Sequence, residues 1–93
     1  SEAFIGIDVS KSFLDLAVRP NGTLLRFAND QSGIRTCVRF ARKCAPAVIV
    51  IESTGGAESA LVASLASASL PVAVVNPRQV RDFAKAWNDP RRG

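Results

Sequence analysis

Two acidic residues, Asp8 and Glu52, each directly follow a run of apolar residues that is expected to form a buried strand. If these strands are neighbours in one sheet, about 4.8 Å apart, both carboxylates could reach a shared divalent cation. The carboxyl ends of strands are also where open α/β sheets place ligands. Carboxylates without histidine or cysteine form a hard oxygen site, which favours Mg²⁺, with Mn²⁺ as a substitute. A pair of such ions would stabilise the attacking and leaving oxygens in phosphodiester cleavage.

Each carboxylate also has an ordinary structural interpretation. Asp8 would then be a turn residue of a hairpin, and Glu52 a solvated residue whose charge favours the start of the next helix. The metal interpretation gains from topology, because the two positions are far apart in sequence and meet only if their strands pair. Asp15 lies in the middle of an alternating strand pattern, and we assign it no catalytic role.

Basic residues cluster on two predicted helices. On the first, no acidic residue occurs between Gly33 and Pro46, and the basic positions stand opposite the apolar stripe. Such a face can bind phosphates, and a solvated helix face is the common alternative. The nucleic-acid-binding residues expected from this pattern and from the first turn are Lys11, Arg35, Arg39, Arg42, Lys43, Arg78, Arg81 and Lys85.

The elements that must position these residues follow from the spacing of apolar side chains. Apolar runs and alternation separated by turn residues predict three antiparallel strands at 3–9, 12–18 and 23–29. Two further strands, at 47–51 and 72–75, are apolar on both faces, as parallel strands require.

Three helices alternate with the later strands. The first runs from Asp30 or Ser32 to Pro46, and the second follows a turn and cap at residues 53–56. The third begins at Pro77, with its apolar stripe at Val80, Phe83, Ala84 and Trp87. Right-handed crossovers then give a mixed five-stranded sheet of order 3-2-1-4-5 with helices packed on it. This is the ribonuclease H-like α/β arrangement.

Composition limits the possible classes of protein. The 93 residues have room for one domain, residues 1–93, and carry a net charge of +4. With 47% hydrophobic and 22% charged residues, the chain is neither a disordered tract nor a repeat array. Its apolar runs are far shorter than the roughly 20 residues that cross a bilayer, so we expect no membrane partner. Two cysteines without a disulfide framework favour a cytoplasmic location.

Three strings resemble, in order and spacing, the N-terminal domain of the DEDD transposases of bacterial insertion sequences, a family that includes the Piv invertase. They are IGIDVSK at 5–11, ESTG at 52–55 and VVNPRQVRDFAKA at 74–86. The resemblance implies a RuvC-like fold of the ribonuclease H type, Mg²⁺-dependent DNA strand cleavage and joining, and four acidic ligands. It also implies a C-terminal domain with a catalytic serine and, as in better-known members, a structured guide RNA as partner.

Within this resemblance, Asp8 matches the first acidic ligand and Glu52 the second. The third and fourth are aspartates that follow the FAKA string in the family, whereas this chain reads WNDPRRG at 87–93, and Asp89 does not match them. We therefore expect residues 1–93 to be the N-terminal catalytic-core fragment of a longer transposase. The fragment alone should be inactive, and the full-length protein should act on DNA as a homo-oligomer.

Two other functions fit parts of the sequence. One is a phosphotransferase fragment of the actin and sugar-kinase type, whose first strand also ends in Gly-x-Asp before a hairpin. Its turn here, around Lys11, lacks the glycine that lets backbone amides approach a phosphate. The other is a non-catalytic nucleic-acid-binding module that uses the same fold.

Overall fold

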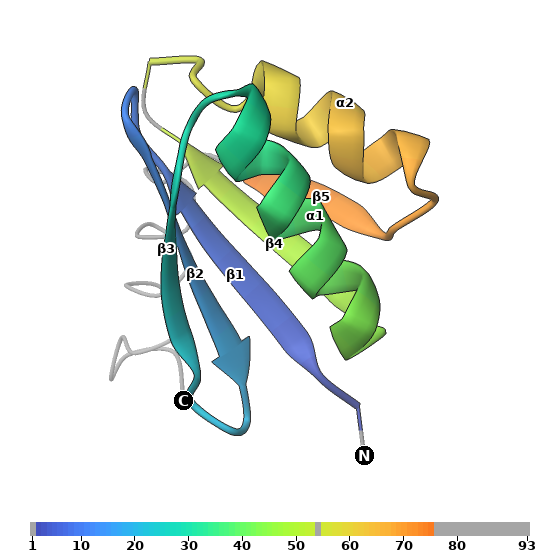
Figure 1. Ribbon diagram of the computed structural model, residues 1–93. Helices are drawn as coiled ribbons and strands as arrows, with labels where there is room; N and C mark the ends of the chain where they lie inside the picture. The colour runs from blue at the N-terminus through green and yellow to red at the C-terminus, as the bar shows by residue number, and fades with distance from the viewer. Residues whose placement is uncertain (1, 54, 76–93) are drawn as a thin grey trace, which may run out of the picture.

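The computed structural model of the protein describes residues 2–53 and 55–75, which form a five-stranded sheet with two helices on one face (Figure 1). The elements are β1 (Phe4–Val9), β2 (Phe13–Arg19), β3 (Leu24–Ala28), α1 (Gln31–Cys44), β4 (Val48–Ser53), α2 (Ser59–Ser67) and β5 (Val72–Val75). The predicted third helix, with Arg78, Arg81 and Lys85, lies outside the described residues.

The strand order β3-β2-β1-β4-β5 confirms the predicted topology. β1 and β2 are antiparallel, as are β2 and β3, whereas β4 runs parallel to β1 and β5 runs parallel to β4. The sheet is therefore mixed, and the fold is ribonuclease H-like. β1, the first strand in the chain, lies at its centre with β4 beside it.

The hydrophobic core lies between the sheet and the two helices. Alternate residues of β1, β2 and β4 point toward α1 and α2, as the period of two in a strand requires. The buried side chains are Ile5, Ile7, Val9, Leu14, Leu16, Val18, Ile34, Cys37, Ala41, Ile49, Ile51, Leu61 and Leu65. The alternating positions in between form the opposite surface, here called the carboxylate face, which includes Gly6, Asp8, Asp15, Ala17, Arg19, Val50 and Glu52.

Local sequence explains where α1 begins and ends. The side chain of Asp30 caps the helix by accepting a 2.7 Å hydrogen bond from the backbone N–H of Gly33. At the other end, Ala45 adopts a left-handed conformation with a φ of 47°, and Pro46 prevents continuation. The predicted N-cap and stop are both confirmed.

The cysteines of α1 are structural residues. Both Cys37 and Cys44 are free thiols; Cys37 is buried and Cys44 is half-buried. Burial raises the pKa of the Cys37 thiol from 9.0 to about 11, because the interior disfavours the charged thiolate. Cys37 therefore remains protonated at neutral pH and packs as a small apolar side chain.

The structure differs from the prediction at two boundaries. β4 continues through Ser53, since its pairing with β1 extends to that residue, so Glu52 lies within the strand. α2 begins at Ser59, later than the predicted cap at 53–56, because Gly55 and Gly56 both have a φ of 75°, which is incompatible with a right-handed helix. These glycines instead form the turn that leaves β4.

Gly33→Ala should destabilise the fold, although alanine normally favours a helix by about 1 kcal/mol over glycine. A Cβ at this position would collide with the backbone carbonyl of Ala28, where α1 lies against the end of β3. We expect a loss of about 1–3 kcal/mol in the free energy of unfolding, measured by urea denaturation. The exposed neighbour change Ser32→Ala serves as the control. Equal or greater stability of Gly33→Ala would contradict the close packing.

Candidate active site

Asp8 and Glu52 are direct register partners on the parallel strands β1 and β4. Their backbones are therefore separated by one strand spacing, about 4.8 Å. Both side chains lie on the carboxylate face, because Ile7 and Ile51, the preceding residues, are buried against the helices. Asp8 is exposed and Glu52 is half-buried. The structure thus brings together the two carboxylates that the sequence singled out.

A third carboxylate, Asp15, for which the sequence pattern indicates no catalytic role, stands in the same row. Asp15 on β2 is the register partner of Asp8, and Arg26 on β3 is the partner of Asp15. Four charged residues therefore cross four adjacent strands in line. The signal for this neighbour was present in the sequence, because a tight turn between β1 and β2 determines which residues of a hairpin face each other.

Asp15 is engaged by Arg26 in a two-point ion pair. The Nε of Arg26 lies 2.6 Å from Oδ1 of Asp15, and its Nη2 donates to Oδ2 at 3.2 Å. The guanidinium also stacks on the ring of Phe13, 4.3 Å from its centroid. Hydrogen bonding from Arg26, aided by its positive charge, lowers the pKa of Asp15. Asp15 is thus a carboxylate already paired with a cation.

The described part of the chain brings two carboxylates together and forms no complete metal cage. In residues 2–53 and 55–75, no group of three or more His, Cys, Asp or Glu side chains is arranged to hold a metal ion. The carboxylates border a hollow of about 260 Å³ on the carboxylate face, lined by Gly6, Ile7, Asp8, Asp15, Ala17, Arg19, Val50 and Glu52. Acidic groups and the cationic Arg19 share this hollow, so it can accept a cation together with an anionic group.

Asn29, at the end of β3, ties together the loops that follow the two carboxylate-bearing strands. Its side-chain amide donates to the carbonyl of Ser10 at 2.8 Å and to that of Ala57 at 3.2 Å. Its backbone N–H also donates to the carbonyl of Ser12 at 2.9 Å. Sequence reasoning placed Asn29 only as the end of a strand, because nothing local shows that its amide spans two loops distant in the chain.

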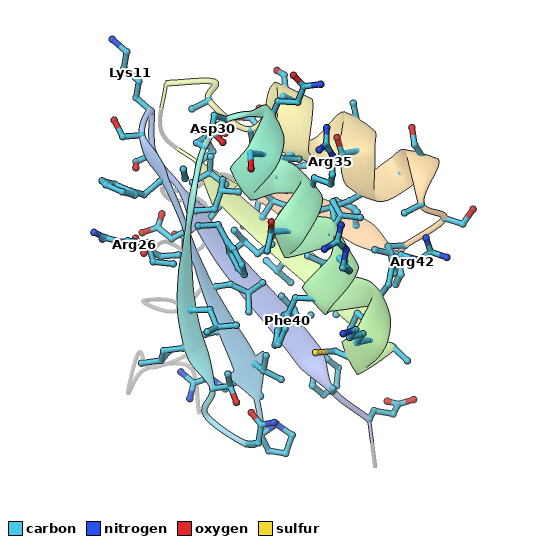
Figure 2. All side chains as sticks on the ribbon, in the orientation of Figure 1. Lys11, Arg26, Asp30, Arg35, Phe40 and Arg42 are labelled. Carbon is cyan, nitrogen blue, oxygen red and sulfur yellow. The ribbon has the colours of Figure 1, made fainter. Side chains whose placement is uncertain are left out.

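The polar residues near the carboxylates have different surroundings. Ser10 closes the β1–β2 turn: its Oγ accepts from the N–H of Phe13, and both distances between this hydroxyl and the Phe13 backbone are 3.2 Å. Lys11 is exposed at the tip of that turn and points away from the sheet (Figure 2). Ser53 follows Glu52 on β4 but pairs with Val9, and its position alternates to the helix side. Thr54 lies outside the described residues.

The basic residues of α1 are not brought to the carboxylates. Arg35, Arg39, Arg42 and Lys43 are exposed on a helix that covers the other face of the sheet (Figures 1 and 2). The predicted stripe of positive charge is therefore present on α1, and it is separated from Asp8 and Glu52 by the sheet itself.

A protein-family model described as a transposase, that of the IS110 group of DEDD transposases, matches residues 5–92. The chain belongs to this transposase family. The matched region includes both register-paired carboxylates, and membership implies DNA as the substrate. No curated protein matches the sequence. None of the transposase's described helices is long and apolar enough to cross a membrane.

Arg26→Gln in this transposase domain should raise the pKa of Asp15 toward its usual value, because the hydrogen bonds and charge that stabilise the carboxylate are removed. The titration of the Asp15 carboxyl carbon, followed by NMR, measures this change. Since the wild-type pKa is depressed, the contribution of the pair to stability is present above the ordinary pKa and is lost as the pH falls through the lowered one. Arg26→Lys, which keeps the positive charge but not the two-point hydrogen bonding of the guanidinium, should give an intermediate pKa for Asp15. An unchanged Asp15 titration in Arg26→Gln would contradict the ion pair.

Asn29→Ala should lower the free energy of unfolding by about 1–2 kcal/mol through loss of two hydrogen bonds. Asn29→Asp should be worse, because it replaces both donors by a carboxylate facing two carbonyl oxygens. Amide hydrogen exchange in residues 10–13 and 55–58 should accelerate in both variants. The control is Asn21→Ala, whose side chain bonds only within the β2–β3 turn. If Asn21→Ala loosened those loops as much as Asn29→Asp, Asn29 would not be the residue that positions them.

Proposed function

We propose that this domain cleaves and joins DNA strands in an Mg²⁺-dependent reaction, with Asp8 and Glu52 as two of the metal ligands. The observation that carries the proposal is their register pairing on adjacent parallel strands, on the face that α1 and α2 do not cover. Membership of a transposase family supports DNA as the substrate.

The donor set fits Mg²⁺, with Mn²⁺ as a substitute. Both side chains offer carboxylate oxygens, and the chain has no histidine; its cysteines are on α1, across the sheet. These are the hard ligands that Mg²⁺ prefers. When bound, such ions supply charge stabilisation to the attacking and leaving oxygens of the phosphodiester. Because Mg²⁺ prefers six ligands, further groups beyond these two are needed.

Other residues of the chain would shape and balance this site. The ion pair with Arg26 neutralises Asp15, which limits the negative charge next to Asp8 and hence the repulsion of a DNA phosphate. Arg19, at the border of the same hollow, offers a guanidinium to that phosphate. Asn29 holds the loops after β1 and β4 in place, which keeps the carboxylates in a constant relative position.

The proposal extends to the organisation of the protein. Residues 1–93 would form the N-terminal part of a transposase catalytic domain, with the remaining acidic ligands contributed from outside the described residues. Two carboxylates bind Mg²⁺ weakly, so the 93-residue chain alone would not catalyse strand cleavage. Homo-oligomerisation and a structured guide RNA belong to the same proposal for the longer protein.

The phosphotransferase alternative finds no support in the β1–β2 turn. In the actin and sugar-kinase arrangement, amides of this hairpin would contact phosphate. Here the N–H of Ser10 donates to the carbonyl of Phe13 at 2.9 Å, and the N–H of Phe13 donates to the Ser10 hydroxyl. Both amides are therefore used inside the turn. The non-catalytic module is the alternative that the metal experiment addresses.

Mg²⁺ added to the 93-residue chain should shift the NMR amide signals around residues 8 and 52 in a saturable manner. Asp8→Asn and Glu52→Gln should each weaken this binding about tenfold or more, since each removes a direct ligand and even outer-shell changes cost about that much. Asp15→Asn is the matched control, because Asp15 is paired with Arg26; it should bind Mg²⁺ within a few-fold of wild type.

Two results would overturn the proposal. If Asp8→Asn and wild type showed the same NMR response to Mg²⁺, the remaining interpretation would be a non-catalytic nucleic-acid-binding module. Metal-dependent cleavage of DNA by the 93-residue chain that survives Asp8→Ala would place the chemistry elsewhere.

A further inference from the structure

The exposed side of α1 is a basic ridge formed by Arg35, Arg39, Arg42 and Lys43. Figure 2 shows Arg35 and Arg42 on one side of the helix and Phe40 on the other. Among the described residues, an ion pair joins Arg26 to Asp15, and none of the four ridge residues takes part in an ion pair. Arg42 and Lys43 lie in the last helical turn, where they favour the helix itself. Arg35 and Arg39 lie too far from that end to be explained in this way.

A groove runs beside this ridge, between α1 and α2. A hollow of about 620 Å³ is bordered by Arg35 and Val38 of α1, and by small side chains of α2: Ala60, Ala63, Ser64 and Ser67. Its other end, at the start of α1, is lined by Asn29, Asp30, Gln31 and Ile34, and the carboxylate of Asp30 there is engaged in capping the helix. A second hollow, of about 380 Å³, shares Arg35 and Val38 and continues along the ridge to Arg39, Arg42 and Lys43. Small side chains on one wall leave space for a bulky polyanion backbone, and serine hydroxyls can donate to its phosphates.

This surface faces away from the carboxylates. α1 lies on the sheet face that buries Ile7 and Val9, and Asp8 points to the opposite face. A duplex is stiff over about 150 base pairs, so a short segment bound at Asp8 cannot bend around the sheet to reach α1. Duplex DNA on the ridge is therefore a different segment from the one at the carboxylates.

We infer that the ridge and the α1–α2 groove bind the backbone of a second segment of duplex DNA, distinct from the segment at the carboxylate face. Charge complementarity carries this inference, and it rests on the proposed function only in taking DNA as the substrate. A duplex fits better than a single strand, because single-strand sites offer aromatic rings for stacking. The exposed large apolar side chains of the described residues are Phe4, Phe13, Leu24, Leu25 and Val74, all of which lie on strands.

The test is the salt dependence of duplex binding by the 93-residue chain, measured by fluorescence anisotropy in EDTA. Each lost phosphate contact should reduce the slope of log K against log salt by about 0.9, so Arg35→Gln/Arg39→Gln should reduce it by about 1.8. Arg35→Lys/Arg39→Lys keeps both charges and should retain the wild-type slope. Circular dichroism would confirm that the variants are folded. Without metal in the buffer, the result is independent of whether Asp8 and Glu52 bind Mg²⁺.

NMR mapping locates the duplex directly. Added duplex should shift amide signals of residues 35–43 and 60–67. The inference is overturned if the signals that move belong only to the carboxylate face, or if Arg35→Gln/Arg39→Gln keeps the wild-type slope. It is also overturned if a single-stranded oligonucleotide or duplex RNA binds as tightly with the same dependence on Arg35 and Arg39, since the ridge would then be a general polyanion surface.

Discussion

The parallel pairing of β1 with β4 is the interaction on which the candidate site depends. Six consecutive residue pairs, from Phe4 with Val48 to Val9 with Ser53, hold the two strands in one register. A slip by one residue would turn every side chain of β4 to the other face. Burial of Ile49 and Ile51 against the helices prevents this slip, because it would expose both. The energy that aligns the two carboxylates thus comes from the apolar residues beside them.

The sheet also separates two surfaces of different charge. The carboxylate face bears acidic side chains in a row, and the helix layer on the other face bears the basic ridge. If both surfaces bind nucleic acid, they do so in different ways: one through a cation held by carboxylates, the other through direct contact with phosphates. The sheet and the helices packed on it fix the relative orientation of the two surfaces.

Side-chain pairs at the edge of the site control charge and loop position. Adjacent carboxylates repel each other. The guanidinium of Arg26 compensates the charge of Asp15 on β2, which is not one of the proposed metal ligands. Asn29 fixes the position of the loops, because its side-chain amide donates hydrogen bonds to two loops that follow different strands. Arg26 lies on the edge strand β3 and Asn29 follows directly after it. The edge strand thus supports a site that lies on the central strands.

The sequence by itself determined the order of the described strands and helices, the ends of α1, the sheet order and the pair of carboxylates. The elements and the ends of α1 follow from local signals: apolar periodicity within one element, the Asp30 cap and the Pro46 stop. The sheet order, and with it the pairing of the carboxylates, follows from the right-handed crossovers that connect parallel strands. Only the tertiary structure decided that Asp15 stands beside Asp8, that Ser53 faces the helices, that Asn29 spans two loops and that the basic ridge lies across the sheet. The reason is physical: periodicity shows which residues of one strand share a face, whereas register and layer placement depend on packing between segments distant in the chain.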